Sequence, residues 1–139
     1  GFEQKSIPLP VSVSAIKDFA LDSYGNLFIL PKGQHNILWI SGQGDELGVI
    51  GGFGTEMAEQ LNGPRSLTVD NQDRLHVLDG GSRTVKVFKN NGVFLYEYGQ
   101  SRWHNQRRLH SLDGRERIAI KGGMMQDSLW QFSQTGKLQ

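Results

Sequence analysis

Apolar and polar residues alternate in four short runs between residues 62 and 99, and turn residues close each run. Leu67-Thr68-Val69 and Leu75-His76-Val77 each place two apolar side chains on one face, and Val85-Lys86-Val87 repeats the pattern. The fourth run, residues 93–98, follows an Asn-Asn-Gly sequence of the kind found in tight hairpins. A period of two in β-branched and aromatic residues indicates half-buried strands. This stretch therefore predicts four consecutive antiparallel strands.

The same pattern occurs once more upstream. Residues 19–30 align with residues 67–78 at an offset of 48, and the offset holds without a gap for the rest of the unit. Glycines and apolar residues match together, as in the pairs Gly33 and Gly81, Ile37 and Val85, Gly44 and Gly92, and Gly51 and Gly99. Chance produces a few such matches but not the whole series. The chain therefore contains an internal repeat, and each copy has the size of one four-stranded propeller blade of about forty residues.

A third copy is weaker. Residues 128–136 resemble residues 84–92 at an offset of 44, and residues 117–120 resemble residues 74–77 at an offset of 43. This copy stops at Gln139, where its outer strand would begin. The pattern predicts an all-β fold, a partial β-propeller of two to three four-stranded blades.

We expect a single domain over residues 1–139. Its expected parts are an outer strand (residues 2–9) within 1–16, blade 1 at 17–54, a linker at 55–63, blade 2 at 64–99, and a linker with an incomplete blade 3 at 100–139. Within the linker at 55–63, Thr55 has the side chain of a helix cap, which predicts a single helical turn with Met57, Ala58 and Leu61 on one side.

The second repeat resembles an NHL repeat, whose sequence runs approximately P-x-G-I-A-V-D, G-N-[IL]-Y-V-A-D, N-H-R-[IV]-Q-V-F and F-x-x-x-[FY]-G. This chain supplies Pro64, Leu67, Val69-Asp70, Leu75, Val77, Asp79, Val85, Val87-Phe88, Gly92 and Tyr98-Gly99. The first repeat supplies Asp22, Gly25-Asn26-Leu27, Gln34-His35-Asn36-Ile37 and Ile40. The chain departs from the pattern where Ser66 replaces a glycine and Pro31 an acidic residue. The resemblance implies NHL-type blades over about residues 15–100, and it implies no single function, because members of the family do many things.

Composition and charge limit the classes of protein and of site that this chain could represent. The chain has 139 residues, of which 37% are hydrophobic and 21% charged, as in a globular domain. The formal net charge of +1 selects no class of partner. The absence of cysteine excludes disulfides, thiolate metal sites and a cysteine nucleophile. No transmembrane segment or signal peptide is visible in the sequence, so the localisation is unknown.

Enzyme chemistry has no positive signal in the sequence. Asp22, Asp70 and Asp113 follow the innermost strand of each repeat, where an aspartate typically closes an Asx turn, although acids in this place could also ring a channel and bind a cation or substrate. The histidines lie on separate expected elements without a carboxylate at ligand spacing, namely His35, His76, His104 and His110. There is no G-x-S-x-G sequence. We therefore expect a protein that is not an enzyme and binds no cofactor. The alternative that the resemblance keeps open is a propeller-type hydrolase or lyase with a central metal.

Two to three blades do not close a ring, because propellers have typically four to eight blades. The chain should therefore expose the faces that neighbouring blades would cover. We expect an interaction or assembly module that binds a protein partner, associates with itself, or completes a propeller within a larger complex. Two copies of a three-bladed chain would give a six-bladed ring.

Residues 100–117 break the repeat and carry five arginines against two acids. Arginine binds phosphate or carboxylate through two parallel hydrogen bonds, and tryptophan stacks on bases or cofactor rings. The expected partner-binding residues are Arg102, Trp103, His104, Arg107, Arg108, Arg115 and Arg117. Three interpretations stay open: a loop that docks a protein or is merely solvated, an RNA-binding face of the kind that the NHL resemblance implies for some members, and a site for other anions.

The RNA interpretation yields a test. If it is right, replacing Arg107 and Arg108 by alanine weakens RNA binding and reduces its dependence on salt, because each arginine that neutralises a phosphate releases counterions. Titrations of a labelled RNA at several salt concentrations measure both quantities. Unchanged binding in the variant, or no binding by the unmodified chain, would remove this interpretation.

Overall fold

The computed structural model describes residues 8–98, 108–111, 117–121 and 129–133. Its regular structure in these residues is three antiparallel sheets and a 3-10 helix, η1 (Val13–Ala15). The first sheet, blade 1, contains β1 (Ile16–Leu21), β2 (Leu27–Pro31), β3 (Ile37–Ile40) and β4 (Glu46–Ile50). The second, blade 2, contains β5 (Pro64–Val69), β6 (Leu75–Asp79), β7 (Thr84–Phe88) and β8 (Phe94–Tyr98). The third sheet contains β9 (Arg108–Ser111), β10 (Arg117–Lys121) and β11 (Leu129–Ser133).

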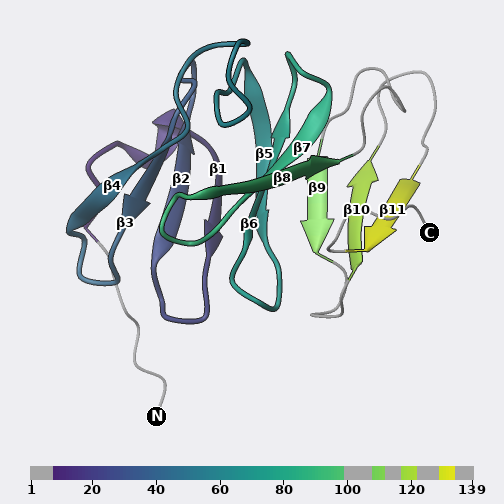
Figure 1. Ribbon diagram of the computed structural model, residues 1–139. Helices are drawn as coiled ribbons and strands as arrows, with labels where there is room; N and C mark the ends of the chain where they lie inside the picture. The colour runs from purple at the N-terminus through teal and green to yellow at the C-terminus, as the bar shows by residue number, and fades with distance from the viewer. Residues whose placement is uncertain (1–7, 99–107, 112–116, 122–128, 134–139) are drawn as a thin grey trace.

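The three sheets stand side by side in chain order, as Figure 1 shows. Each sheet is an up-and-down meander, and the first strands are neighbours, because β1 lies against β5 and β5 lies against β9. Successive four-stranded meanders that pack through their first strands are the arrangement of propeller blades around an axis. The all-β, partial-propeller fold expected from the repeat is therefore confirmed.

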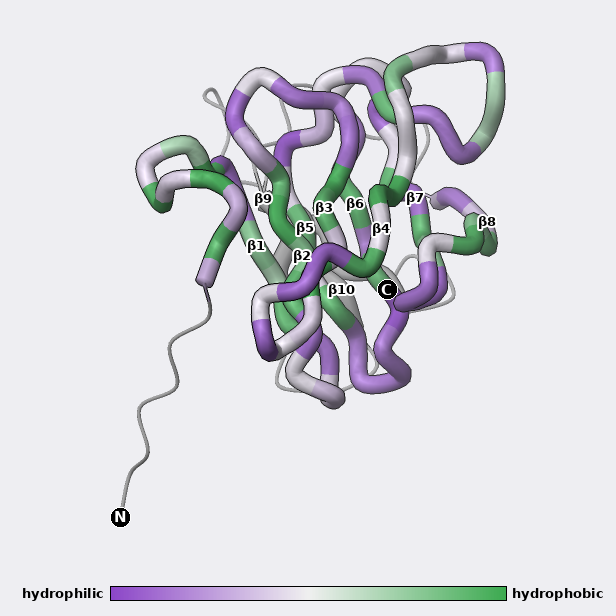
Figure 2. Tube along the Cα trace, turned by 90° about the vertical axis from the view of Figure 1, so that its left-hand side faces the viewer, coloured by the Kyte–Doolittle hydropathy of each residue, from purple (hydrophilic) through white to green (hydrophobic). Residues whose placement is uncertain are grey.

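The turns after the first strand of each blade are built by an aspartate. Asp22 Oδ1 accepts the backbone N–H groups of Tyr24 and Asn26 at 3.0 and 2.8 Å. Asp70 Oδ1 accepts those of Gln72 and Arg74, both at 2.9 Å. These are the Asx turns that the sequence indicates, and the backbone satisfies one oxygen of each carboxylate. Asp113, the third residue of this set, lies outside the described residues. Figure 2 shows hydrophilic residues in these turns and hydrophobic ones along the strands.

One turn residue, Asp73, also forms hydrogen bonds between the two blades. Asp73 has a left-handed backbone, with φ of 60°, at the repeat position where blade 1 has Gly25, with φ of 83°. Aspartate is among the few residues that tolerate this region. The Asp73 carboxylate accepts the N–H of Ser23 at 2.8 Å and also its hydroxyl. The turn of blade 2 is therefore bonded to the turn of blade 1.

The main hydrophobic core lies between the two blades. Blade 1 contributes Phe28, Leu30, Ile37 and Ile50, and blade 2 contributes Leu67, Leu75, Val77 and Phe88. The linker adds Leu61, whose side chain is fully buried. Burying a large aliphatic or aromatic side chain stabilises a fold by about 1.5–3 kcal/mol. The contact between the blades is therefore a major source of stability in the described part of the chain.

The linker forms no helical turn, so that expectation was wrong. Its backbone N–H groups at Glu56 and Met57 donate to Gln60 Oε1, at 3.1 and 2.8 Å. Lys86 of β7 is buried and donates from Nζ to the carbonyls of Ala58 and Gln60, both at 2.8 Å. Side chains thus make the hydrogen bonds to linker N–H and C=O groups that a helix would make within its own backbone. The bonds from Lys86 also fasten the linker to blade 2.

Most of the expected outer strand at residues 2–9 lies outside the described residues, so this strand stays a prediction. Residues 8–12 form no strand, and residues 2–7 lie outside the described residues. Leu9 and Val11 instead pack on Leu27, Ile29 and Ile40, on the side of blade 1 that faces away from blade 2. The segment covers a sheet face and does not extend a sheet edge.

The third sheet has three strands in the order β11-β10-β9, which agrees with an incomplete third blade. Part of the segment expected to be a linker is a strand, since β9 occupies residues 108–111 and pairs with β10. The described part of the chain has no helix with the length and apolar character that crossing a membrane requires.

Asp18 of β1 makes the principal polar contact across the interface between the blades. Its Oδ2 accepts the hydroxyl of Ser66 at 2.9 Å and the N–H of Leu67 at 2.8 Å. Ser66 holds the same repeat position in blade 2 that Asp18 holds in blade 1. Hydrogen bonds to a charged acceptor contribute about 1.5–3 kcal/mol each.

We expect Asp18→Ala to lower the free energy of unfolding by about 1.5–3 kcal/mol, because the N–H of Leu67 is left without its acceptor. Urea unfolding followed by circular dichroism measures this change. Asp45→Ala, which removes an exposed carboxylate from the β3–β4 turn, is the matched control and should change stability by less than about 0.5 kcal/mol. Equal effects of the two substitutions would show that the Asp18 contact does not stabilise the interface.

Candidate functional site

The side of blade 1 that faces away from blade 2 is apolar and partly uncovered. Phe19 is 58% exposed and Leu21 52% exposed, and Val49 on β4 is 50% exposed. Strand pairing places Phe19 beside Ile29, Leu21 beside Leu27, and Val49 beside Leu38. These side chains therefore lie on one side of the sheet, with Phe19 and Leu21 exposed on β1, Val49 exposed on β4, and Leu27 and Ile29 between them beneath Leu9 and Val11. We call the exposed residues Phe19, Leu21 and Val49 the open face of blade 1.

In blade 2, the residues equivalent to the open face are covered by a neighbouring blade. At the repeat offset of 48, Phe19 and Leu21 correspond to Leu67 and Val69. Leu67 is 4% exposed in the core between the blades, and Val69 packs against that core. The same positions are thus covered in blade 2, by blade 1, and exposed in blade 1. The sequence predicts exposed blade faces, but only the burial pattern identifies the residues that form one.

The basic segment predicted to bind a partner lies mostly outside the described residues. This applies to Arg102, Trp103, His104, Arg107 and Arg115. The structure places the other two by backbone register: Arg108 pairs with Lys121 at one end of the third sheet, and Arg117 pairs with Ser133 at the other end. The described strands therefore separate Arg108 from Arg117, which sequence proximity had grouped. Partner binding by these residues stays a prediction.

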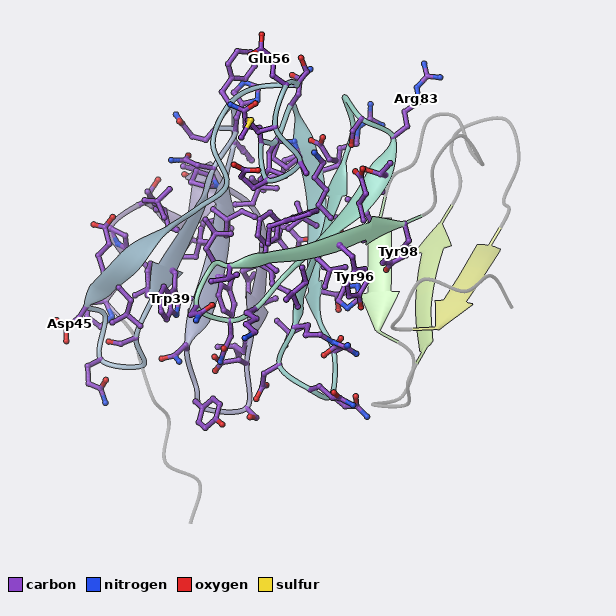
Figure 3. The ribbon with its side chains drawn as sticks, viewed as in Figure 1. Trp39, Asp45, Glu56, Arg83, Tyr96 and Tyr98 are labelled. Atoms are coloured by element: carbon purple, nitrogen blue, oxygen red, sulfur yellow. The ribbon has the colours of Figure 1, made fainter. Side chains whose placement is uncertain are left out.

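A hydrogen-bonded chain lies on the opposite face of blade 2. His76 is fully buried, and its Nε2 lies 2.8 Å from Asp70 Oδ2 while its Nδ1 lies 2.9 Å from the Tyr98 hydroxyl. Arg74 Nε also donates to Asp70 Oδ2, at 2.7 Å. Because an ionised carboxylate only accepts, a neutral His76 must carry its proton on Nε2 and accept the Tyr98 hydroxyl on Nδ1. Figure 3 shows Tyr96 and Tyr98 near each other toward the end of β8.

The pKa values in this chain have physical causes that favour one protonation state. Burial lowers the pKa of His76 below 6.5, and the hydrogen bond to Asp70 opposes this effect only in part. Burial alone would raise the pKa of Asp70, but hydrogen bonds from His76 and Arg74 outweigh it, so this pKa lies below 3.8. Burial raises the pKa of Tyr98 well above 10.0. At neutral pH the chain thus consists of an anionic Asp70, a neutral His76 and a neutral Tyr98.

His35 has a structural contact as well. Its Nδ1 accepts the N–H of Gly63, at 3.0 Å, and its ring lies 4.4 Å from the ring of Phe53, centroid to centroid. This hydrogen bond joins the β2–β3 turn of blade 1 to the linker before blade 2. Among the described residues, no three histidine, aspartate or glutamate side chains come close enough to hold a metal ion.

No protein-family model matches this chain, and no curated protein matches it. Several solved structures are similar. A streptogramin B lyase gives a TM-score of 0.63 at 14% identity, over 96% of this chain and 42% of the lyase chain. A Bacteroides fragilis protein described as exported gives 0.70 at 17% identity, over 95% of this chain and 39% of that chain. A Bacteroides caccae protein of unknown function gives 0.59 at 12% identity, over 89% and 44%.

Identities this low show the fold alone. The similar structures support a propeller-like fold, in agreement with the three successive sheets. The NHL family itself stays a resemblance. This chain spans less than half the length of each of these three proteins. One of them is an enzyme and another has no known function, so the expectation that this chain is not an enzyme stays a prediction.

The pKa values predict how stability depends on pH. The folded pKa of His76 lies below 6.5, so the folded state binds fewer protons than the unfolded state, and stability falls as the pH drops below 6.5. The slope for one such group is at most about 1.4 kcal/mol per pH unit. The contribution of Asp70 is lost only below pH 3.8, which separates the two effects.

We expect His76→Gln to remove this loss of stability between neutral and mildly acidic pH, because glutamine does not titrate there. Urea unfolding of both proteins at a series of pH values measures the difference, and the other three histidines are common to both. Tyr98→Phe is the control, because it removes a partner of His76 but keeps the imidazole, and it should keep the pH dependence. Parallel curves for the unmodified chain and His76→Gln would contradict the assignment.

Proposed function

We propose that this chain is an assembly module whose open face binds a further propeller-type blade. The observation that supports this function is a difference in exposure between equivalent residues of the two blades. Leu67 is 4% exposed beneath blade 1, whereas its equivalent Phe19 is 58% exposed. Clustered apolar side chains of this size on a sheet face are typical of an interaction surface.

The neighbouring face of blade 2 indicates what kind of surface would fit. Leu67 and Val69 are covered by Phe28, Leu30 and Ile37 of blade 1, which are fully buried. An occupant of the open face needs a similar flat row of aliphatic and aromatic side chains, spaced as in a twisted sheet. Another blade of the same construction has this chemistry, and a single helix or an extended peptide would cover only part of the four strands.

The similar structures are consistent with an occupant of this kind. The propeller-like chains that resemble this one are more than twice its length, since this chain spans 39–44% of them. In a closed propeller every blade face is covered by a neighbour. A second copy of this chain could supply the further blade, and this source can be tested with the purified chain alone.

We expect the purified chain to associate, with a dimer of twice 15.5 kDa as the simplest product. Phe19→Ser with Leu21→Ser should weaken association at least about tenfold, because each substitution removes roughly 1.5–3 kcal/mol of apolar burial from the interface. Light scattering over a concentration series measures the mass, and circular dichroism of the same samples checks the fold.

The matched control is Tyr24→Ser with Val93→Ser. Both residues are exposed, at 76% and 53%, but they lie in the β1–β2 and β7–β8 turns and not on the open face. The control should associate as the unmodified chain does. A folded monomer at all concentrations that does not bind a hydrophobic dye would contradict the proposal.

A further inference from the structure

The segment before β1 covers part of the surface that a further blade would contact. Leu9 and Val11 pack on three buried residues of β2 and β3. These are Leu27, Ile29 and Ile40. At the repeat offset of 48 their equivalents in blade 2 are Leu75, Val77 and Phe88, which belong to the core that blade 1 covers. Leu9 and Val11 therefore occupy positions that a neighbouring blade occupies in blade 2.

The equivalent segment of blade 2, the linker, follows a different path. The offset of 48 relates Val13 to Leu61, since β1 begins at Ile16 and β5 at Pro64. Leu61 is fully buried between the blades, whereas Val13 is 75% exposed. Beside a preceding blade, this segment thus inserts an aliphatic side chain into the interface. Before blade 1 it lies across the face of the sheet instead.

The two paths diverge just before the first strand. The N–H of Lys32 donates to the carbonyl of Ala15 at 2.8 Å, and blade 2 has the equivalent bond, from Gly80 to Gly63 at 3.1 Å. The preceding carbonyl in blade 2, that of Asn62, accepts a further backbone bond at 2.7 Å. Its equivalent, Ser14, accepts none within the described residues. The backbone is therefore alike in both blades from Ala15 onwards, which places a hinge at Ser14.

Residues 8–11 are held on blade 1 by side-chain packing. In the part of the chain that the structure describes, no backbone hydrogen bond joins them to the sheet. Pro8 and Pro10 have no N–H to donate. Pro8 lies against Gly44 of the β3–β4 turn, where a Cβ atom would come within 2.5 Å of the proline ring. A segment with a few apolar contacts and no backbone bonds opens with a small change in free energy.

We propose that residues 8–14 form a strap that competes with a docking blade for the side of blade 1 that carries the open face. In the closed position, Leu9 and Val11 cover the sheet. In the released position, the strap follows the path of the linker, and Val13 enters the new interface as Leu61 does between blades 1 and 2. This inference rests on the proposed function and adds the regulation of the same surface. The fraction of chains with a released strap then sets the apparent affinity for a further blade.

We expect Leu9→Ser with Val11→Ser to strengthen association at least about fivefold, because the closed position loses its apolar contacts and more chains are competent to bind. Light scattering over a concentration series measures the dissociation constant, and circular dichroism of the same samples checks the fold. Adding Phe19→Ser and Leu21→Ser to this variant should remove the gain. That result would show that the gain comes from the open face and not from general adhesion of the uncovered sheet.

Val13→Ser is the matched variant on the same strap, and its expected effect has the opposite sign. Val13 is exposed in the closed position, so its substitution should leave the unassociated chain as stable as before. Association should weaken at least about threefold, because this side chain is buried only when the strap is released. A segment that merely stabilises blade 1 would give no such pair of opposite effects.

If Leu9→Ser with Val11→Ser does not fold, Gly44→Ala replaces it, because the added Cβ displaces Pro8 and with it the strap. Gly92→Ala is its control. Gly92 holds the equivalent turn position in blade 2 with a φ of 91°, against 92° at Gly44, and its Cβ would meet Ile50 and not the strap. Since both alanines carry the same backbone strain, stronger association of Gly44→Ala alone would support the strap.

Three results would overturn the strap and leave the proposed function intact. They are association through the open face that release of the strap does not strengthen, a gain that persists after Phe19 and Leu21 are replaced, and association that Val13→Ser leaves unchanged. If neither the unmodified chain nor the released variants associate at any concentration, the strap and the proposed function are both wrong.

Discussion

The fold depends on one constraint, which is that a propeller blade has two apolar faces and both must be covered. Between blades 1 and 2 this is achieved by side chains from both sheets and by Leu61 of the linker. On the other side of blade 1, Leu9 and Val11 are the described residues from outside the sheet that pack on it, and Phe19 and Leu21 remain exposed. The free energy gained by apolar burial is proportional to the area removed from water. Further association therefore gains most free energy at the uncovered face. The proposed function follows from this uncovered face.

Polar groups at the interface determine how the blades are aligned, more than how strongly they adhere. Apolar contact has no direction, whereas Asp18 fixes β1 against Leu67 of β5, and Asp73 fixes one turn against Ser23 of the other. Lys86 and Gln60 fasten the linker in the same way. Each of these groups satisfies backbone N–H or C=O groups that strand pairing leaves unbonded, in the first strand of blade 2, in a turn or in the linker. The buried chain of Asp70, His76 and Tyr98 continues this arrangement on the next face of blade 2, where its satisfied hydrogen bonds indicate a structural role.

The sequence predicts local features well and contacts across segments poorly. The repeat, the strands and the aspartate turns follow from residue type and spacing, because each depends on only a few neighbouring residues. The linker is different: its Thr55 signal for a helix is overridden by Gln60, which accepts the same N–H groups in another conformation. The bulges at Lys17 and Arg65 are invisible in a single strand, since a bulge is defined by the register of its partner.

The open face and the contact with blade 2 use opposite sides of the same strand, β1. Alternate residues of a strand point to opposite sides, so Phe19 and Leu21 share one side while Asp18 and Ala20 share the other, which faces blade 2. Lys17 follows neither side, because the bulge removes it from the alternation. A first strand can therefore carry an apolar side for assembly and, on its other side, the polar contact of Asp18 that aligns the two blades, without conflict between them.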